Sequence, residues 1–244
     1  RQPSTAVGSA RLGIMGVGFF ARSMDRGSED CEVDVMCPEG DSWQCERDAV
    51  VRLRITQSGG IYYCSGAMVN NTERDCRQLL LSAFHCADAV EEDEWAYLKI
   101  RYNYEYLECN NTVSVNSHTR TGVIQLTNSD DASNQSFSGS DFLLVEVEDP
   151  IPAIWNPFYA GFDASGEKGY SGVGIHHPAG DRKKISTYTN PLTSYSLASA
   201  GSHWRVYWEA TETNYGVTEG GSSGSPIFTE NHQIVGTLSS GLSA

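Results

Sequence analysis

Gly221-Ser222-Ser223-Gly224-Ser225-Pro226 has the composition of a tight turn that presents a serine hydroxyl. Far upstream, Ser82-Ala83-Phe84-His85-Cys86 places a histidine directly after an apolar run. A serine hydroxyl is a poor nucleophile at neutral pH and needs a base that removes its proton. The two segments therefore predict Ser223 as a nucleophile and His85 as its base.

A third segment supplies the carboxylate that such a histidine needs. Ser138-Gly139-Ser140-Asp141-Phe142-Leu143-Leu144-Val145 places Asp141 at the head of an apolar strand, where it would be buried beside the core. The order His85, Asp141, Ser223 is that of chymotrypsin, whereas subtilisins and α/β-hydrolases order the same groups differently. Each segment alone is a short motif, but together they predict a serine protease site.

Ser222 and Ser225 are the rival nucleophiles in the same turn. The G-x-S-G-x-P template selects Ser223 over both. The His176-His177 pair invites a metal reading, but adjacent strand residues point to opposite faces and make a poor shared ligand set. We therefore expect these histidines to be packing residues, and we expect neither a metal nor another cofactor.

Further motifs contain no residues with an evident catalytic role, so what they indicate is the family to which the chain is related. With the His85, Asp141 and Ser223 segments, the chain resembles the bacterial lysyl endopeptidases, a branch of the chymotrypsin-like serine proteases. The resemblance covers most of the chain and implies an all-β fold of two six-stranded antiparallel barrels. The additional motifs are Cys31-Glu32-Val33-Asp34-Val35-Met36-Cys37-Pro38-Glu39-Gly40-Asp41, Val69-Asn70-Asn71-Thr72, Gly174-Ile175-His176-His177-Pro178 and Gly216-Val217-Thr218-Glu219.

The resemblance also implies roles for residues around Ser223. The backbone N–H groups of Gly221 and Ser223 would form the oxyanion hole. Substrate would pair its backbone with the strand formed by Leu238, Ser239, Ser240 and Gly241. A trypsin-like ion pair between a new N-terminus and an Asp before the nucleophile is not expected, because Ser222 holds that position.

Primary specificity is inferred from the family alone. The pocket Asp of trypsin would fall near the apolar Val217, and the pocket Asp of the lysyl endopeptidases would fall beyond Ala244. Tyr195 and Ser239 stand near the positions where the family stacks a Trp and a His beside the catalytic His. Glu219 is acidic and close to the site, and we expect it to be structural.

Composition sets the class of protein and of partner. The 244 residues are 39% hydrophobic, and Lys+Arg of 17 against Asp+Glu of 31 gives a net charge of −14. This charge argues against nucleic acid or an anionic membrane as partner. It serves either solubility or the attraction of basic peptides. The predicted protease site implies a peptide or protein substrate. No apolar run reaches the roughly 20 residues that span a bilayer.

Seven cysteines indicate an oxidising compartment, so we expect a secreted, extracellular protein. The resemblance pairs Cys64 with Cys86 and Cys37 with Cys109, and elimination leaves Cys45 with Cys76. Cys31 remains, and the family places its partner just beyond Ala244, so an inter-segment or intermolecular disulfide is expected. Asn70, Asn110 and Asn134 head sequons that can carry glycans in a eukaryotic source.

Short alternating or apolar runs separated by Gly, Asn, Asp and Pro predict strands at 49–56, 61–69, 79–83, 96–106, 122–127, 142–147, 157–162, 172–177, 184–188, 204–209, 226–229 and 233–238. We expect a first barrel at residues 29–148 with His85 and Asp141. A second barrel at 149–244 would contain Ser223 and lack its last strand and C-terminal helix. Residues 1–28 form an N-terminal extension, either the tail of a zymogen pro-segment or an ordered arm.

A barrel without its last strand would expose an unpaired edge. Either the protein continues beyond Ala244 or another segment fills the gap. The missing strand, the altered specificity residues and Cys31 also motivate a second hypothesis of a different class. In it, the chain is a secreted structural or binding protein that keeps the protease fold with little or no turnover.

Overall fold

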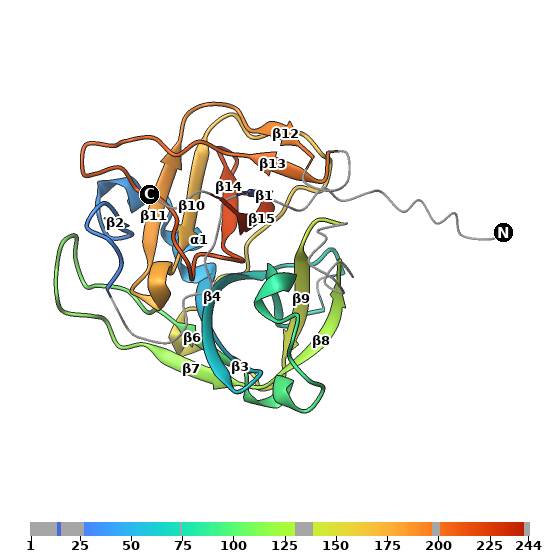
Figure 1. Cartoon of the computed structure of the whole chain (residues 1–244). Coiled ribbons are helices and arrows are strands. Elements are labelled where there is room, and N and C mark those ends of the chain that lie inside the picture. Colours follow the sequence, from blue (N-terminus) through green and yellow to red (C-terminus); the bar gives the residue numbers. More distant parts are fainter. Residues whose placement is uncertain (1–13, 16–26, 74, 130–138, 197–200, 242–244) are drawn as a thin grey trace.

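The computed structural model describes residues 14–15, 27–73, 75–129, 139–196 and 201–241. Two sheets dominate it, and each sheet curls on itself (Figure 1). The first has the strand order β7-β6-β3-β4-β5-β9-β8, and the second has the order β12-β13-β1-β15-β14-β10-β11-β2. The predicted all-β, two-barrel architecture is therefore confirmed. Short extra strands bring the described sheets to seven and eight strands.

The first sheet is built from hairpins. β3 and β4 pair from Val50↔Ala67 to Gln57↔Gly60, so Ser58 and Gly59 form a two-residue turn. Both have positive φ, 48° and 70°, as a tight hairpin turn of this length requires. The strands are β3 Val50–Gln57, β4 Gly60–Val69, β5 Leu79–Ala83, β6 Lys99–Tyr102, β7 His118–Thr121, β8 Val123–Asn128 and β9 Phe142–Val147.

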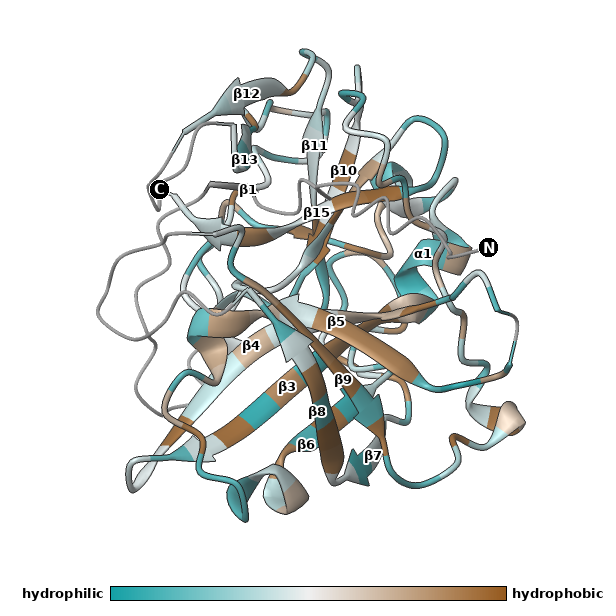
Figure 2. Cartoon of the chain, turned by 90° about the vertical axis from the view of Figure 1, so that its right-hand side faces the viewer, coloured by the Kyte–Doolittle hydropathy of each residue, from teal (hydrophilic) through white to brown (hydrophobic). Residues whose placement is uncertain are grey.

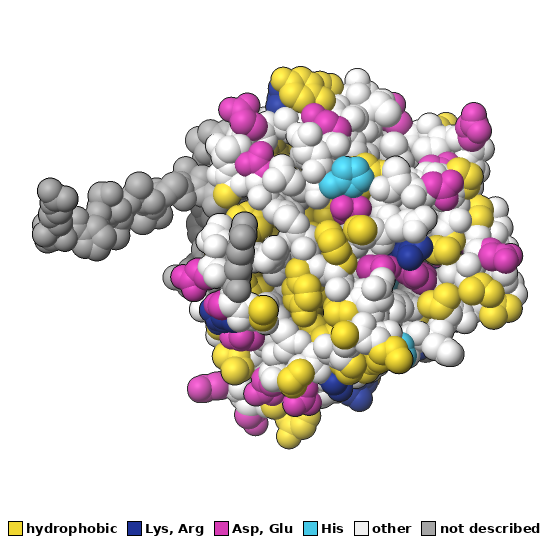
Figure 3. Space-filling view, turned by 180° about the vertical axis from the view of Figure 1, so that it is seen from behind, with side chains coloured by type: hydrophobic (Ala, Val, Ile, Leu, Met, Phe, Trp, Pro, Cys, Tyr) yellow, Lys and Arg dark blue, Asp and Glu magenta, His cyan; other side chains and the backbone are white. Residues whose placement is uncertain are grey.

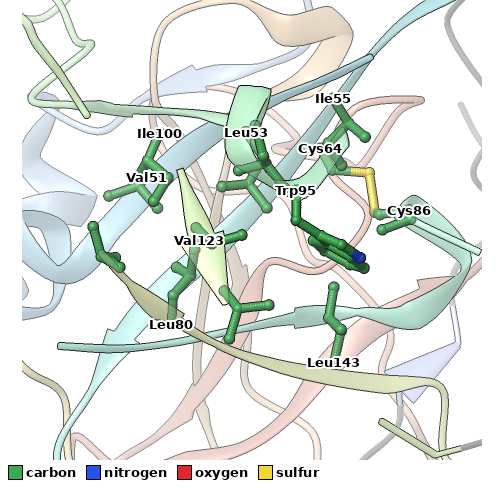
Figure 4. Packing of buried hydrophobic residues seen from close by; sticks show 14 of the residues in the cluster. Val51, Leu53, Ile55, Cys64, Leu80, Cys86, Trp95, Ile100, Val123 and Leu143 are labelled. Atoms are coloured by element: carbon green, nitrogen blue, oxygen red, sulfur yellow. A yellow bond between two sulfur atoms is a disulfide. The ribbon is translucent and has the colours of Figure 1, made fainter. Parts of the chain in front are cut away.

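Alternation along these strands fills the first barrel. Val51, Leu53 and Ile55 of β3 are at most 1% exposed and point inward together with Trp95 and Leu143 (Figure 4). Figure 2 shows the same hydrophobic bands along β3, β5 and β9. Burial of this interior fixes the register of β5 against β9 because a one-residue slip would turn the apolar face outward.

The second sheet contains β10 Gly172–His176, β11 Lys184–Tyr188, β12 Thr193–Tyr195, β13 His203–Arg205, β14 Pro226–Thr229 and β15 Ile234–Ser240. β2 Val33–Asp34 pairs with β11, and β1 Ile14–Met15 lies between β13 and β15. Residues assigned to the first barrel and to the extension thus extend the second sheet. A two-residue strand has no periodicity that reveals its partner, so sequence could not place either one. β1 covers the edge of β15 that was expected to lack a neighbour.

Short helices make the corners: α1 Gln44–Ala49 and the 3₁₀ turns Pro38–Gly40, Phe84–Cys86, Glu94–Tyr97, Ala153–Trp155 and Pro178–Gly180. Part of the expected strand 96–106 is taken by the turn Glu94–Tyr97. The expected strand 157–162 makes only the single bridges Val69↔Ala160 and Phe162↔Ile234. Within the described ranges, no helix is long and apolar enough to cross a membrane.

Two disulfides form, Cys37–Cys109 and Cys64–Cys86. The pairing of Cys45 with Cys76 is wrong, because both are free and exposed. Cys45 lies on α1 and Cys76 in the loop before β5, and elimination assumed that every available thiol is bonded. Cys31 is also a free thiol and is partly buried.

Acidic side chains are spread over the face of the molecule in Figure 3 and are not gathered into one patch. This distribution fits a general contribution of the negative charge to solubility. Two of the three sequon asparagines, Asn70 and Asn110, are exposed. Asn134 lies outside the described residues.

Candidate active site

His85 is held by the turn that ends β5. Ala83 is the last residue of β5 and pairs with Phe142 of β9, which brings the segment after β5 beside the residue before β9. The N–H of Phe84 donates to the carbonyl of Asp141 at 2.9 Å. Cys86 is bonded to Cys64 of β4, so the backbone on the other side of His85 is also tied down.

Hydrogen bonds from His85 and Ser239 hold the side-chain carboxylate of Asp141. Its Oδ2 is 2.6 Å from His85 Nδ1, its Oδ1 accepts the His85 backbone N–H at 2.9 Å, and Ser239 Oγ donates to Oδ2 at 2.6 Å. The residue is 2% exposed, whereas the side chain of His85 is 15% exposed. An acceptor on Nδ1 selects the tautomer with its proton there, so the basic lone pair of His85 is on Nε2.

Ser239 is a site residue whose role sequence analysis missed. It was expected to bind the substrate backbone, but its hydroxyl reaches from β15 in the second sheet to the carboxylate of Asp141. Nothing in the local sequence around Ser239 signals this contact, because the two residues are 98 positions apart. Tyr195, the other substituted position, lies on β12 with its ring under the Arg205 guanidinium at 4.1 Å.

The turn that contains Ser223 is held by backbone hydrogen bonds, two within the turn and one to β15. Ser222 N–H donates to Glu219 C=O at 3.0 Å, Ser225 N–H to Ser222 C=O at 3.0 Å, and Gly224 N–H to Leu238 C=O at 2.8 Å. The N–H groups of Gly221 and Ser223 donate to no acceptor among the described residues.

The surroundings of Gly224 place this turn against the end of β5. A Cβ on Gly224 would lie 2.1 Å from Ser82 Oγ and 2.8 Å from Ala83 N, and its φ is +79°. Only glycine combines this conformation with so close an approach. Ser223, which is 6% exposed, therefore lies in a turn packed directly against the end of β5, the strand that leads to His85.

Ser65 joins the two barrels at this turn. Its N–H donates to the carbonyl of Ser223 at 2.8 Å, and its hydroxyl donates to the carbonyl of Gly221 at 2.9 Å. The same hydroxyl accepts the N–H of His177 at 2.9 Å. Ser65 is fully buried, so its three bonds are shielded from water. It follows Cys64 in the sequence, but only the tertiary structure reveals this role.

His176 holds the turn from behind. Its Nδ1 is 2.8 Å from Ser222 Oγ, and its Nε2 is 2.9 Å from Ser186 Oγ. Ser186 Oγ donates to the carbonyl of Val217, so it must accept from a protonated Nε2, and Ser222 then donates to Nδ1. Burial, with the nearby Lys184 cation, lowers the pKa of His176 to about 3, which keeps the ring neutral.

His177 points to different partners. Its Nδ1 is 2.9 Å from the carbonyl of Asp181, and its Nε2 is buried without a hydrogen-bond partner among the described residues. Burial, reinforced by the cation of Lys183, lowers the pKa of His177 well below its ordinary value. The described ranges contain no group of three His, Cys, Asp or Glu residues that could hold a metal.

Two curled antiparallel sheets, with a His–Asp pair on the first and a serine turn on the second, are the architecture of the chymotrypsin-like serine proteases. The family model "Lysyl endopeptidase, C-terminal domain" matches residues 26–244, and the chain belongs to this family.

Known proteins agree with this assignment. A lysyl endopeptidase of Pseudomonas aeruginosa is 30% identical over 239 residues, which cover 91% of this chain and 48% of that protein. The chain thus spans about half the length of this curated relative. A thermostable serine protease, AL20, from an extremophilic microorganism superposes with a TM-score of 0.51 at 14% identity, over 77% of this chain and 81% of that one. The latter likeness supports the fold.

Proposed function

We propose that the protein is a secreted serine endopeptidase with Ser223 as nucleophile, His85 as general base and Asp141 as the group that orients His85. The observation that carries this proposal is the set of three hydrogen bonds to the buried carboxylate of Asp141. They hold the His85 ring in the tautomer that a base for Ser223 requires.

In the proposed reaction, Nε2 of His85 takes the proton of Ser223 Oγ as that oxygen attacks a peptide carbonyl carbon. Asp141 stays ionised and stabilises the imidazolium that forms. The imidazolium then donates its proton to the leaving amine, the C–N bond breaks, and an acyl-enzyme remains. Water repeats the sequence, with its proton going to His85 and the Ser223 oxygen leaving as the hydroxyl.

The N–H groups of Gly221 and Ser223 would bind the oxyanion of both tetrahedral intermediates. The support for this role is that the N–H groups of Ser222 and Ser225 are bonded within the turn and that of Gly224 to Leu238, whereas those of Gly221 and Ser223 have no acceptor among the described residues. Gly221 has φ +100°, and a Cβ there would lie 2.8 Å from the backbone of Gly180. A side chain at this position would therefore displace one of the two donors.

Substrate class and location follow from the family. We propose cleavage after Lys or another basic residue, with the substrate backbone paired along Leu238 to Gly241. Leu238 bonds Gly224 and Ser225 on one flank, and Ile14 and Met15 of β1 pair with Leu238 and Ser240 on the other, so the substrate backbone would have to take the place of β1. The two disulfides support an oxidising, extracellular setting.

A fluorophosphonate probe followed by peptide mapping tests the nucleophile. Adduct should form on Ser223 and should be abolished by His85→Ala, while the exposed-site control Ser165→Ala should label as the wild type does. Peptides that differ only in the residue before the scissile bond (Lys, Arg or Ala) test specificity. If the folded protein does not label, the proposal of a serine endopeptidase is refuted, and the alternative of a structural or binding protein with little or no turnover is favoured.

A further inference from the structure

A second buried acid lies behind the nucleophile turn. Glu32 immediately precedes β2, and its side chain is 1% exposed. Neither oxygen of its carboxyl accepts a hydrogen bond from any of the described residues. Another carboxyl, that of Glu219, is the neighbouring group that acts on it most strongly. A buried carboxylate without a donor, next to a second carboxylate, would be strongly destabilised.

The surroundings decide which member of the pair holds the proton. Burial raises the pKa of Glu32 well above its ordinary value, and the negative charges of Glu219 and Asp181 act in the same direction. Lys184 opposes them, but its ammonium group is already paired with Asp34. Glu219 Oε1 accepts the backbone N–H of Glu29 at 3.0 Å, whereas neither oxygen of Glu32 has a donor among the described residues. With the proton on Glu32, its O–H is the group able to donate to Glu219.

His176 does not neutralise this acid. Its Nε2 lies 3.8 Å from Glu32 Oε2, beyond hydrogen-bond distance, and it bonds Ser186 instead. The neutral ring therefore gives Glu32 no charge partner. The thiol of Cys31 is another titratable neighbour, and burial raises its pKa.

Glu219 belongs to the turn that positions Ser223. Its backbone N–H donates to Ser222 Oγ at 3.2 Å, and its carbonyl accepts the Ser222 N–H at 3.0 Å. Ser222 continues the chain of hydrogen bonds to His176. An interaction that holds the Glu219 side chain in place therefore also holds the backbone from Glu219 to Ser223.

We propose that Glu32 is a buried, protonated carboxylic acid whose hydrogen bond to Glu219 positions the turn of Ser223. The inference rests on the proposed function, in which Glu32 and Glu219 are positioning residues. It also supplies an anchor for the turn in a chain where Ser222 rules out the ion pair with an N-terminus. Loss of the shared proton at alkaline pH leaves two adjacent carboxylates with Asp181 nearby, and their repulsion displaces the turn.

The protonation state is tested without relying on activity. Infrared spectra at neutral pH are compared between Ser223→Ala and the double variant Ser223→Ala/Glu32→Gln. We expect a carbonyl band of a protonated carboxylic acid in the first, and its loss in the second. Ser223→Ala/Glu167→Gln, which changes an exposed glutamate, should keep the band. Absence of the band in the first protein would overturn the proposal, whether or not the protein is a protease.

The positioning role is tested by pH profiles of kcat/KM. Glu32→Ala should lower kcat/KM at neutral pH by about tenfold or more, because Glu219 loses its buried donor. Glu32→Gln keeps an N–H donor without a titrating proton, so it should recover activity relative to Glu32→Ala and shift the alkaline decline to higher pH. Glu167→Gln should follow the wild-type profile. An alkaline limb that is identical in wild type and Glu32→Gln would refute the positioning role while leaving the protease proposal intact.

Discussion

Ser65→Ala should loosen the junction between the two barrels at the nucleophile turn. The substitution removes only a hydroxyl, but that hydroxyl donates to Gly221 C=O and accepts from His177 N–H, both at 2.9 Å in a fully buried position. Each buried backbone group left without a partner costs about 1–3 kcal/mol. The two together therefore predict a loss of about 2–6 kcal/mol in unfolding free energy. The Ser65 N–H bond to Ser223 remains, so the fold should survive.

Thermal unfolding measures this loss directly. For a chain of this size, 1 kcal/mol lowers Tm by about 2–4 °C, so Ser65→Ala should melt at least about 4 °C below the wild type. Ser165→Ala is the matched control, because its hydroxyl accepts a single exposed bond from Glu167 and should change stability by less than about 0.5 kcal/mol. Equal Tm values for the two variants would refute the reasoning. The rate of fluorophosphonate labelling should fall in Ser65→Ala and should stay at the wild-type value in Ser165→Ala.

Three further substitutions test other contacts that hold the candidate active site and the fold around it. Ser239→Ala removes a charge-assisted bond to the carboxylate of Asp141 and should lower kcat by about tenfold or more with little change in KM, measured by steady-state kinetics. Replacing Cys64 and Cys86 by Ser opens a loop worth about 3 kcal/mol and should lower Tm by about 6–12 °C, whereas Cys45→Ser should leave Tm unchanged. His176 has a folded-state pKa of about 3, below its unfolded value, so its stabilising contribution is complete above about pH 6.5 and is lost as pH falls towards 3. A profile of Tm against pH should therefore be shallower in His176→Asn, and an unchanged slope would count against a neutral buried ring.

Local sequence was sufficient for the fold class and for many strands. β5, β11 and β14 begin and end where the sequence pattern predicted strands, and nearly all of their residues are buried. The strand expected at 96–106 was overextended, since its first residues form a 3₁₀ turn. Apolar content alone does not distinguish the two conformations.

The cysteine pairing also shows how far the sequence alone can predict the structure. The bridges Cys37–Cys109 and Cys64–Cys86 came from a resemblance that carries information about the whole family fold. Pairing the remaining Cys45 and Cys76 by elimination carried no such information and was wrong. A disulfide requires two backbones to approach closely, which counting cannot establish.

The sequence by itself determined the all-β class, the family, and His85, Asp141 and Ser223 as the residues to examine, because each lies in a short motif whose chemistry is local. Only the tertiary structure showed which other residues hold these three in position. Ser65 and Ser239 act across the barrel interface, and burial of Glu32 depends on how β2 joins the second sheet. Such contacts join residues about 100 or more positions apart, and no periodicity or spacing along the chain encodes which polar side chains meet.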